Sequence, residues 1–475
     1  MSPAIWRLVG FLAAVEIASG VIQGYYTPLY SDIADHLRIT DGDVNWFEAA
    51  QLIVSALAVP FLSRLGDLHG HRNVLLVATL VTALAGWGVA VAPDFWTFLV
   101  AWGIQGVYAV WLPMEIAILH ERSRDRPDQE ALVRKGAGFL VLALEVGVIA
   151  GALSAGALQP VLGMTGLLAM PAAATTIALV AIWFGVRDAP TQAKGGRLDL
   201  PGTGLLTLGL LGLLAGLVVV RVQGPLSPLA WLLMLAGAAV LAVFVRVERR
   251  TDSPLIDVRM LAGPRMWPVQ VAAALFGMSV LGAQIPLSTF ARTDPAEVGY
   301  GFGVSAAAIA NVIGLYVACM AIGALLSPVL ARKLGVRWML VLAAVLVAAG
   351  YATFLPLHGV LWHAMLAMGI AGLGSGALVA SLPAAAAAAA THGATAEAAG
   401  LTNATKTVGG CIASAIFAVA LTSTGSISEP GAGHAPLEGY LTVWAICAVS
   451  ALVAALCLAR LPRPELRAEA QATTS

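Results

Sequence analysis

Charged residues are scarce in this sequence. Only 11% of its 475 residues are Asp, Glu, Lys or Arg, while 59% are hydrophobic, and the mean hydropathy is +0.87. No soluble domain can bury that much apolar surface, so the composition excludes a soluble globular protein. One membrane-spanning helix needs about 20 apolar residues, so the chain can hold about 14 spans. This leaves no room for a large domain outside the bilayer.

Several chemical signals are also missing. Lys plus Arg equals Asp plus Glu at 26 each, so no net charge attracts nucleic acid. The chain has no Walker A loop, which argues against ATP-driven transport by this chain alone. His69 and His71 lack metal-ligand spacing, and the sequence predicts neither a metal site nor a cofactor. We expect free thiols in apolar stretches at Cys319, Cys411, Cys447 and Cys457.

Apolar runs between polar breaks predict fourteen membrane-spanning helices. The first run lacks the short apolar core and cleavage site of a secretory signal, so we expect it to be retained as a span. Several runs exceed the minimum length, which tilting or proline kinks would accommodate. The predicted spans are 6–30, 44–64, 73–92, 95–119, 136–158, 165–186, 202–220, 229–246, 266–290, 304–330, 336–356, 360–388, 400–424 and 438–460.

The positive charges predict which side of the membrane each connection faces. Most of the 26 Lys and Arg residues fall in alternate connections, whereas the opposite side holds only Arg38, Arg221 and Arg292. Cytoplasmic connections are enriched in Lys and Arg. The pattern therefore predicts a multi-pass protein of the cell membrane with both termini in the cytoplasm.

The chain also contains an internal repeat. The segment RLGDLHGHR at 64–72 follows the second span and VLARKLGVR at 329–337 follows the tenth. Gly70 and Arg72 match Gly335 and Arg337. We therefore predict an all-α fold of two six-helix bundles, 1–190 and 261–475, with an inserted two-helix hairpin at 191–260. In parallel-repeat transporters, substrate binds between such halves near the midplane. No pattern sets an oligomeric state, and we take a monomer as the working hypothesis.

The first of these turns, from Ser63 to Arg72, resembles the G-x-L-a-D-r-x-G-r-[KR] signature of the major facilitator superfamily, with Asp67, Gly70 and Arg72 matching. The resemblance implies that the turn latches the two halves in one state. Three further segments resemble the fourteen-span drug:proton antiporter family of that superfamily. They are 197–204, 247–255 and Asn403 with 407–410.

Two departures from that family weaken the case for proton coupling. Its fourth span carries R-x-x-Q-G, with an arginine linked to proton transfer, but the chain has Trp102 there, followed by Gln105 and Gly106. Its fifth-span proline is replaced by Ala152. A proton-independent facilitator or importer of a small organic solute therefore stays open as the alternative.

Acidic side chains inside spans are costly and mark ion paths. Glu16 and Glu145 lie about 10 residues into the first and fifth predicted spans, near the midplane at 1.5 Å per residue. We expect these two to be the leading proton-coupling candidates, with Glu115 third, and Glu48 to lie at the membrane interface. Lys406 either pairs with an acid across the interface between the halves or extends to the membrane surface. Structural hydrogen bonding is the competing explanation for the acids.

Aromatic and amide side chains supply a candidate substrate cavity, since aromatic faces suit amphipathic or cationic organic molecules. Helix packing explains the same residues equally well. The candidates are Tyr25, Tyr26, Trp102, Gln105, Tyr108, Trp111, Gln284 and Asn311.

Together these features predict a secondary active transporter that exports small amphipathic organic compounds or drugs in exchange for protons by alternating access. Its expected partners are a small-molecule substrate, protons and the lipid bilayer. A membrane-embedded enzyme would need convergent nucleophilic, metal or phosphate-binding groups, which the sequence does not show. A non-transporting sensor with a transporter fold is a further alternative, but the sequence does not predict the appended signalling domain that would support it.

Overall fold

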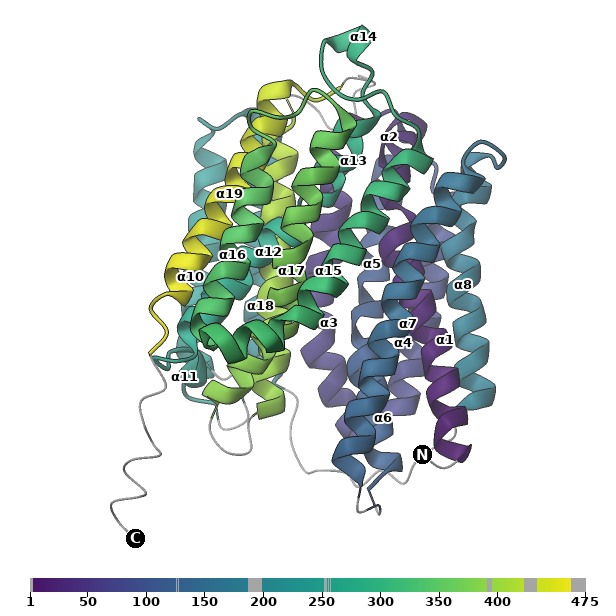
Figure 1. Cartoon of the computed structure of the whole chain (residues 1–475), viewed down its shortest axis with the longest axis vertical. Helices are drawn as coiled ribbons and strands as arrows, with labels where there is room; N and C mark the ends of the chain where they lie inside the picture. Colours follow the sequence, from purple (N-terminus) through teal and green to yellow (C-terminus); the bar gives the residue numbers. More distant parts are fainter. Residues whose placement is uncertain are drawn as a thin grey trace.

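The computed structural model describes residues 3–124, 126, 128–186, 199–251, 254, 256, 258–390, 395–422 and 434–462. Every regular element in these ranges is a helix, and the long helices run roughly side by side (Figure 1). This agrees with the predicted all-α class. The N-terminal half contains α1 (Pro3–Tyr25), η1 (Thr27–Leu29), α2 (Tyr30–Leu37), α3 (Asn45–His69), α4 (His71–Val91), α5 (Phe95–Gln105), η2 (Gly106–Val110), α6 (Trp111–Arg122), α7 (Gln129–Leu158) and α8 (Met164–Gly185).

The rest of the chain forms a hairpin and a second set of long helices. The hairpin consists of α9 (Leu200–Gln223) and α10 (Pro228–Glu248). The C-terminal half contains α11 (Val258–Leu261), α12 (Trp267–Val280), α13 (Gln284–Arg292), α14 (Pro295–Val298), α15 (Ala306–Leu334), α16 (Val336–Thr353), α17 (Leu361–Ala389), α18 (Thr395–Ala420) and α19 (Leu437–Leu458).

Thirteen helical segments in the described residues are long and apolar enough to cross a membrane. They match thirteen of the fourteen predicted spans. The remaining prediction corresponds to α18, which is long enough at 26 residues but has polar residues such as Asn403, Thr405 and Lys406 in its first half. α18 lies within the bundle, packed on α12 and α3. Large apolar side chains such as Val77, Leu84 and Val91 on α4 remain exposed, as expected of a helix that faces lipid.

The two halves repeat the same packing. α1 packs on α7 in the first half as α12 packs on α18 in the second, and the pair α4 and α8 corresponds to α16 and α19. A Cβ on Gly147 would collide with the carbonyl oxygen of Ile17, and one on Gly409 would collide with that of Ala274. The absent side chains let each helix pair approach closely, as small residues do in membrane bundles. The matched contacts make Ile17 equivalent to Ala274.

The first span of each half is broken in the middle. The chain passes from α1 through η1 to α2, and from α12 through a turn at 281–283 to α13. Pro28 lies at the first break and Pro286 just after the second. Proline removes a backbone donor and interrupts the helical ladder. Such discontinuous helices occur in membrane proteins where the backbone lines a cavity or is buried in protein.

The hairpin packs where the two halves meet. α9 contacts α3 of the first half and α18 of the second. Leu206 and Leu210 of α9 share an apolar cluster with Leu52 of α3 and Cys411 of α18. Near the far end of the hairpin, the Arg221 guanidinium donates two hydrogen bonds of 3.0 Å to the Asp43 carboxylate, and both side chains are buried. The hairpin is therefore fixed to the N-terminal half by a buried ion pair.

Candidate functional site

Glu16 of α1 and Glu115 of α6 form a carboxyl pair inside the N-terminal half. Both side chains are 0% exposed, and the two carboxyl groups interact electrostatically with each other. Among the described residues, no hydrogen-bond partner reaches any of the four oxygens. Two buried carboxylates side by side repel each other, so this arrangement favours a pair that holds at least one proton. Such a pair can hold and release a proton.

Tyr108 interacts with both this pair and Glu48. Tyr108 of η2 is half-buried and interacts electrostatically with Glu16 and with Glu48 of α3. Glu48 also interacts with Cys411 of α18. The expected position of Glu48 at the membrane interface stays a prediction, and its side chain is half-buried in the first turn of α3. Its predicted place near a span end could not show which face of the helix it would occupy.

Glu145 and Lys406 are oppositely charged residues that belong to opposite halves of the chain. Glu145 of α7 belongs to the first half and Lys406 of α18 to the second, both are half-buried, and they interact electrostatically. They are not close enough to form an ion pair. Tyr316 of α15 also interacts with Glu145 and donates a 3.0 Å hydrogen bond to the Ser375 hydroxyl of α17. Both hypotheses for Lys406, pairing with an acid across the interface and extension to the membrane surface, therefore stay predictions.

Glu16 and Glu145, the two leading candidates by sequence, have different interaction partners in the structure. Glu16 lies beside Glu115, and Glu145 lies beside Lys406. Depth along a span can be counted from the sequence, but the face of the helix that meets a neighbour depends on tertiary packing. Glu115, the third candidate by sequence, thus becomes the direct partner of Glu16.

Most predicted aromatic cavity residues form a packed core. The Trp102 ring lies 4.4 Å from the Tyr26 ring between centroids, and the Gln105 amide donates a 3.2 Å hydrogen bond to the Tyr26 hydroxyl. Trp102, Tyr26 and Gln105 are each 1% exposed, and Tyr25 and Trp111 are likewise buried. In this conformation these side chains connect α1 to α5 rather than facing open space. Trp102, at the place of the family's arginine, is part of that core.

The other two cavity candidates lie apart from this cluster. Gln284 begins α13, is half-buried, and donates to the Val280 carbonyl of the preceding turn at 3.3 Å. Asn311 is an exposed residue in the second turn of α15. Neither side chain makes a hydrogen bond to the aromatic core in the described part of the chain.

The two repeated turns adopt the same backbone conformation. Gly70 has φ +93° and Gly335 has φ +80°, values that residues with a Cβ rarely adopt. Asp67 lies 3.7 Å from Arg64 and 3.4 Å from His71. The Arg72 guanidinium donates to the Val186 and Trp183 carbonyls at the end of α8, as a cation at a helix C-terminus should.

His71 is a turn residue that the sequence analysis did not select. Its Nδ1 lies 2.8 Å from the Glu121 carboxylate of α6, and its Nε2 faces Asp67. It therefore bridges the turn to the end of the fourth span. The i, i+4 spacing from Asp67 was visible in the sequence, but Glu121 lies 50 positions away. Arg337, the counterpart of Arg72, stacks over the Trp338 ring at 5.1 Å.

An ion pair and hydrogen bonds join elements of the two halves at the end of the bundle opposite the start of α1 and the end of α19. Arg292 of α13 contacts Asp32 of α2 at 2.8 Å, and Gln159, which directly follows α7, donates to the same carboxylate at 3.1 Å. Ser288 of α13 donates to the Thr27 carbonyl of η1. The ribbons of the halves lie close at this end and separate toward the end where α1 begins and α19 ends (Figure 1). We call these contacts the distal clasp.

A histidine adds a pH-sensitive contact beside the clasp. His434 in the connection before α19 lies 3.0 Å from the Asp41 carboxylate in the connection after α2, and Glu297 lies 3.9 Å from its other nitrogen. The hydrogen bond to Asp41 raises the pKa of His434 above its usual value. Burial raises the pKa of Asp41, although the hydrogen bond from His434 opposes this effect.

The family comparison identifies this architecture. A family model described as Major Facilitator Superfamily matches residues 12–293 and 269–474. The chain belongs to the Major Facilitator Superfamily. It is 26% identical to a lincomycin resistance protein of Streptomyces lincolnensis over 62% of this chain and 61% of that protein. It is 27% identical to a probable actinorhodin transporter of Streptomyces coelicolor over 79% and 65%. The matches thus span less than two thirds of these relatives.

Solved structures of other transporters share the fold at low sequence identity. The structure of an auto-inhibited POT family peptide transporter has a TM-score of 0.66 and 15% identity, and covers 98% of both chains. A mutant of the nucleoside transporter NupG has a TM-score of 0.64 and 13% identity over 96% of this chain and 98% of that one. These likenesses establish the fold. Together with the thirteen apolar helices, they make this superfamily member a multi-pass membrane protein.

Proposed function

We propose that this protein is a secondary active transporter that exports small amphipathic organic compounds in exchange for protons. The family assignment supports transport by alternating access. The names of its relatives support export, since these relatives include a lincomycin resistance protein and a cephamycin export protein of Amycolatopsis lactamdurans. We further propose membership of the fourteen-span drug:proton antiporters, with α18 as the fourteenth span and both termini in the cytoplasm.

The carboxyl pair of Glu16 and Glu115 carries the proposal of proton exchange. Losing the last proton would leave two like charges side by side, and unit charges about 4 Å apart repel by about 4 kcal/mol at an effective dielectric constant of about 20. The pair therefore keeps a proton while it is sealed from water and from cations. Water or a substrate group reaching the pair from the Tyr108 side would allow release. Rocking of the halves would then decide to which side the proton leaves.

In this scheme the distal clasp seals the extracellular side. The Asp32 and Arg292 pair holds α2 against α13, while the halves separate at the end with the repeated turns. The described conformation then corresponds to the cytoplasm-facing state, in which substrate enters between the halves. Opening the clasp and closing the opposite end would complete the cycle.

The proposal is tested by proton release from proteoliposomes when substrate is added. We would offer the purified protein lincomycin, puromycin and lipophilic cations, and compare Glu16→Gln and Glu115→Gln with the matched control Glu438→Gln, an exposed acid in the first turn of α19. Substrate-evoked release should disappear in both variants of the pair and persist in the control. Release that is unchanged in both variants would remove the pair from the mechanism.

A proton-independent facilitator is the second candidate. Trp102 replaces the arginine that the drug:proton antiporters carry, and here it lies in a sealed aromatic core. A relative named as a uridine/deoxyuridine transporter of Lactococcus lactis is 24% identical over 58% of this chain. Substrate flux without any proton movement in the same proteoliposomes would favour this candidate.

A further inference from the structure

A hollow in the C-terminal half has a different character from the carboxyl pair. It lies among α12, α17 and α18, and it is shallow: its enclosed part has room for about one water molecule, and the rest of its volume of about 200 Å³ is open. One wall is apolar and the other is polar. Phe276, Leu378 and Leu382 supply the apolar wall, and Thr402, Asn403 and Lys406 supply the polar one.

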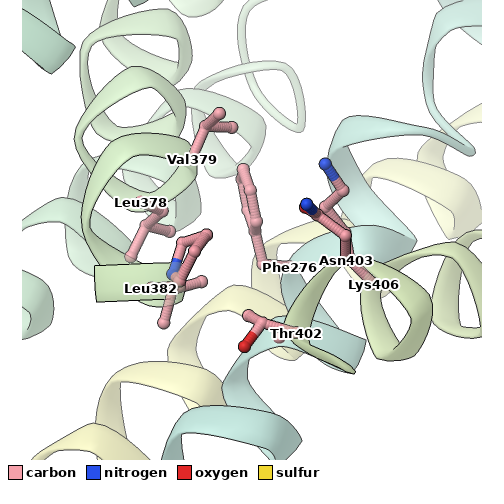
Figure 2. Close-up of a pocket in the computed structure, with 9 residues that line it drawn as sticks. Phe276, Leu378, Val379, Leu382, Thr402, Asn403 and Lys406 are labelled. Atoms are coloured by element: carbon pink, nitrogen blue, oxygen red, sulfur yellow. The ribbon is translucent and has the colours of Figure 1, made fainter. Parts of the chain in front are cut away.

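The polar groups of α18 are free to meet a ligand. Figure 2 shows the nitrogen ends of Asn403 and Lys406 projecting in the same direction, with the Phe276 ring between them and the aliphatic side chains of α17. Thr402 is already engaged, because it donates to the Ala398 carbonyl at 2.9 Å and accepts from Gln270 at 3.1 Å. Within the described residues, the side chains of Asn403 and Lys406 have no hydrogen-bond partner. Both are donors, so the hollow presents donors and positive charge.

The hollow occupies the place that the carboxyl pair has in the other half. Since Ile17 corresponds to Ala274 through the matched glycine contacts, Glu16 corresponds to Ala273, which lines the hollow. The acid of the first half is thus a methyl group in the second. The space that this leaves is bordered by an ammonium group rather than a carboxyl group. The equivalent places in the two halves therefore differ in the charge of the side chain beside them.

We propose that this hollow binds the anionic end of amphipathic substrates. A carboxylate would accept hydrogen bonds from Lys406 and Asn403, and its aromatic or aliphatic body would lie against Phe276 and Leu382. An ammonium at membrane depth is costly without a counter-charge. Glu145 is the acidic side chain that interacts with Lys406, but it belongs to the opposite half and lies beyond ion-pair distance. A bound carboxylate would neutralise Lys406 from within its own half.

This inference names the substrate class of the proposed transporter and so rests on that proposed function. It also predicts one substitution that should strengthen ligand binding instead of weakening it. Because Glu145 and the substrate carboxylate both interact with Lys406 and repel each other, removing the Glu145 charge should tighten anion binding. Most other ligand contacts would be weakened, not strengthened, by altering a neighbouring cavity residue.

The test is isothermal titration of the full-length protein in nanodiscs with naphthoate, its uncharged analogue naphthamide and the cation naphthylmethylamine. Wild-type protein should bind naphthoate tightest. Lys406→Met should weaken naphthoate binding at least about tenfold, the value of one charged contact of about 1.4 kcal/mol, and leave naphthamide unchanged. Glu145→Gln should tighten it several-fold. The matched control Lys135→Met, at an exposed lysine on α7, should change nothing.

Three results would overturn the inference. They are equal binding of naphthoate and naphthamide by wild-type protein, no binding of naphthoate, or unchanged naphthoate affinity in Lys406→Met. Lys406→Arg, which keeps the charge, should retain binding and shows that a loss in Lys406→Met is not misfolding. Naphthoate binding that depends on Lys406 without substrate-evoked proton release would refute the exchange mechanism and leave the anion site standing. The reverse result would refute only the anion site.

Discussion

The distal clasp gives a prediction that tests how the halves are held together. Arg292→Gln and Asp32→Asn each remove one charge from an ion pair whose atoms lie 2.8 Å apart and whose side chains are 20% and 18% exposed. Arg292→Gln should have the larger effect, because it leaves the Asp32 carboxylate with only the Gln159 amide as a partner. Asp32→Asn leaves an arginine that can turn toward water. Both variants should open the clasp.

The expected size follows from the contact. Hydrogen bonds to charged groups contribute about 1.5 to 3 kcal/mol, and partial exposure places this pair toward the lower end. Such a loss changes the ratio of closed to open molecules by roughly 10-fold to 150-fold. The interaction is local and partly screened, so high salt should reduce the difference between variant and wild type.

Cysteine alkylation measures this ratio. Thr27 is 2% exposed and its carbonyl accepts the Ser288 hydrogen bond, so Thr27→Cys should react slowly with a membrane-impermeant maleimide until the clasp opens. Its reaction should accelerate at least about 10-fold in Arg292→Gln, and the charge swap Asp32→Arg with Arg292→Asp should slow it again. The control is Arg126→Gln, which breaks an exposed 2.9 Å pair with Asp128. Equal alkylation rates in the clasp variants and the parent would refute this role.

Three further predictions concern the hairpin, a histidine and a glycine. Arg221→Met should lower the free energy of unfolding by about 3 to 5 kcal/mol, because it leaves the buried Asp43 carboxylate without its cation. The double variant Arg221→Met with Asp43→Leu should lie near wild type in thermal unfolding. Equal losses of stability in the single and the double variant would contradict this. Because the pKa of His434 is raised, the stabilising contact of its imidazolium is complete below about pH 6.5 and is lost as the pH rises through the raised value. His434→Gln should therefore flatten the pH dependence of thermal stability between roughly pH 6 and 9. Gly147→Ala should lower the unfolding temperature because the new methyl group would collide with α1, whereas Gly138→Ala on the same helix should not, since its Cβ would meet nothing within 4 Å.

The sequence predicted the fold well because the bilayer constrains it strongly. Backbone groups in hydrocarbon must be satisfied within a helix, so apolar length reveals each span. The glycines of the repeated turns, Gly70 and Gly335, could be located because only a residue without a Cβ suits their positive φ. The polar first half of α18 is where composition was least informative. Lys406 and Asn403, which line the hollow, lower the mean hydropathy of this helix.

The candidate site was less predictable because charged partners meet through tertiary packing. No spacing in the sequence connects Glu16 with Glu115, since the helices between them set the distance. The same holds for Glu145 and Lys406, which come from opposite halves. Aromatic composition alone could not distinguish a ligand-binding cavity from a packed core. Trp102 and Tyr26 have the chemistry of a ligand cage, yet their contact with each other fills the space that a ligand would need.

The asymmetry between two similar halves explains how one fold could couple two events. A repeat with identical side chains would offer two equal sites, and rocking the halves would move a ligand without linking it to anything else. Here one half has a sealed carboxyl pair, and the equivalent place in the other has an open hollow beside an ammonium group. Glu145, which reaches from the first half toward Lys406, is the one acid in the described spans that interacts with the hollow's charge. Any substrate that neutralises Lys406 therefore changes the electrostatic attraction between the halves. Substrate binding therefore changes the relative free energies of the two conformations between which the halves rock.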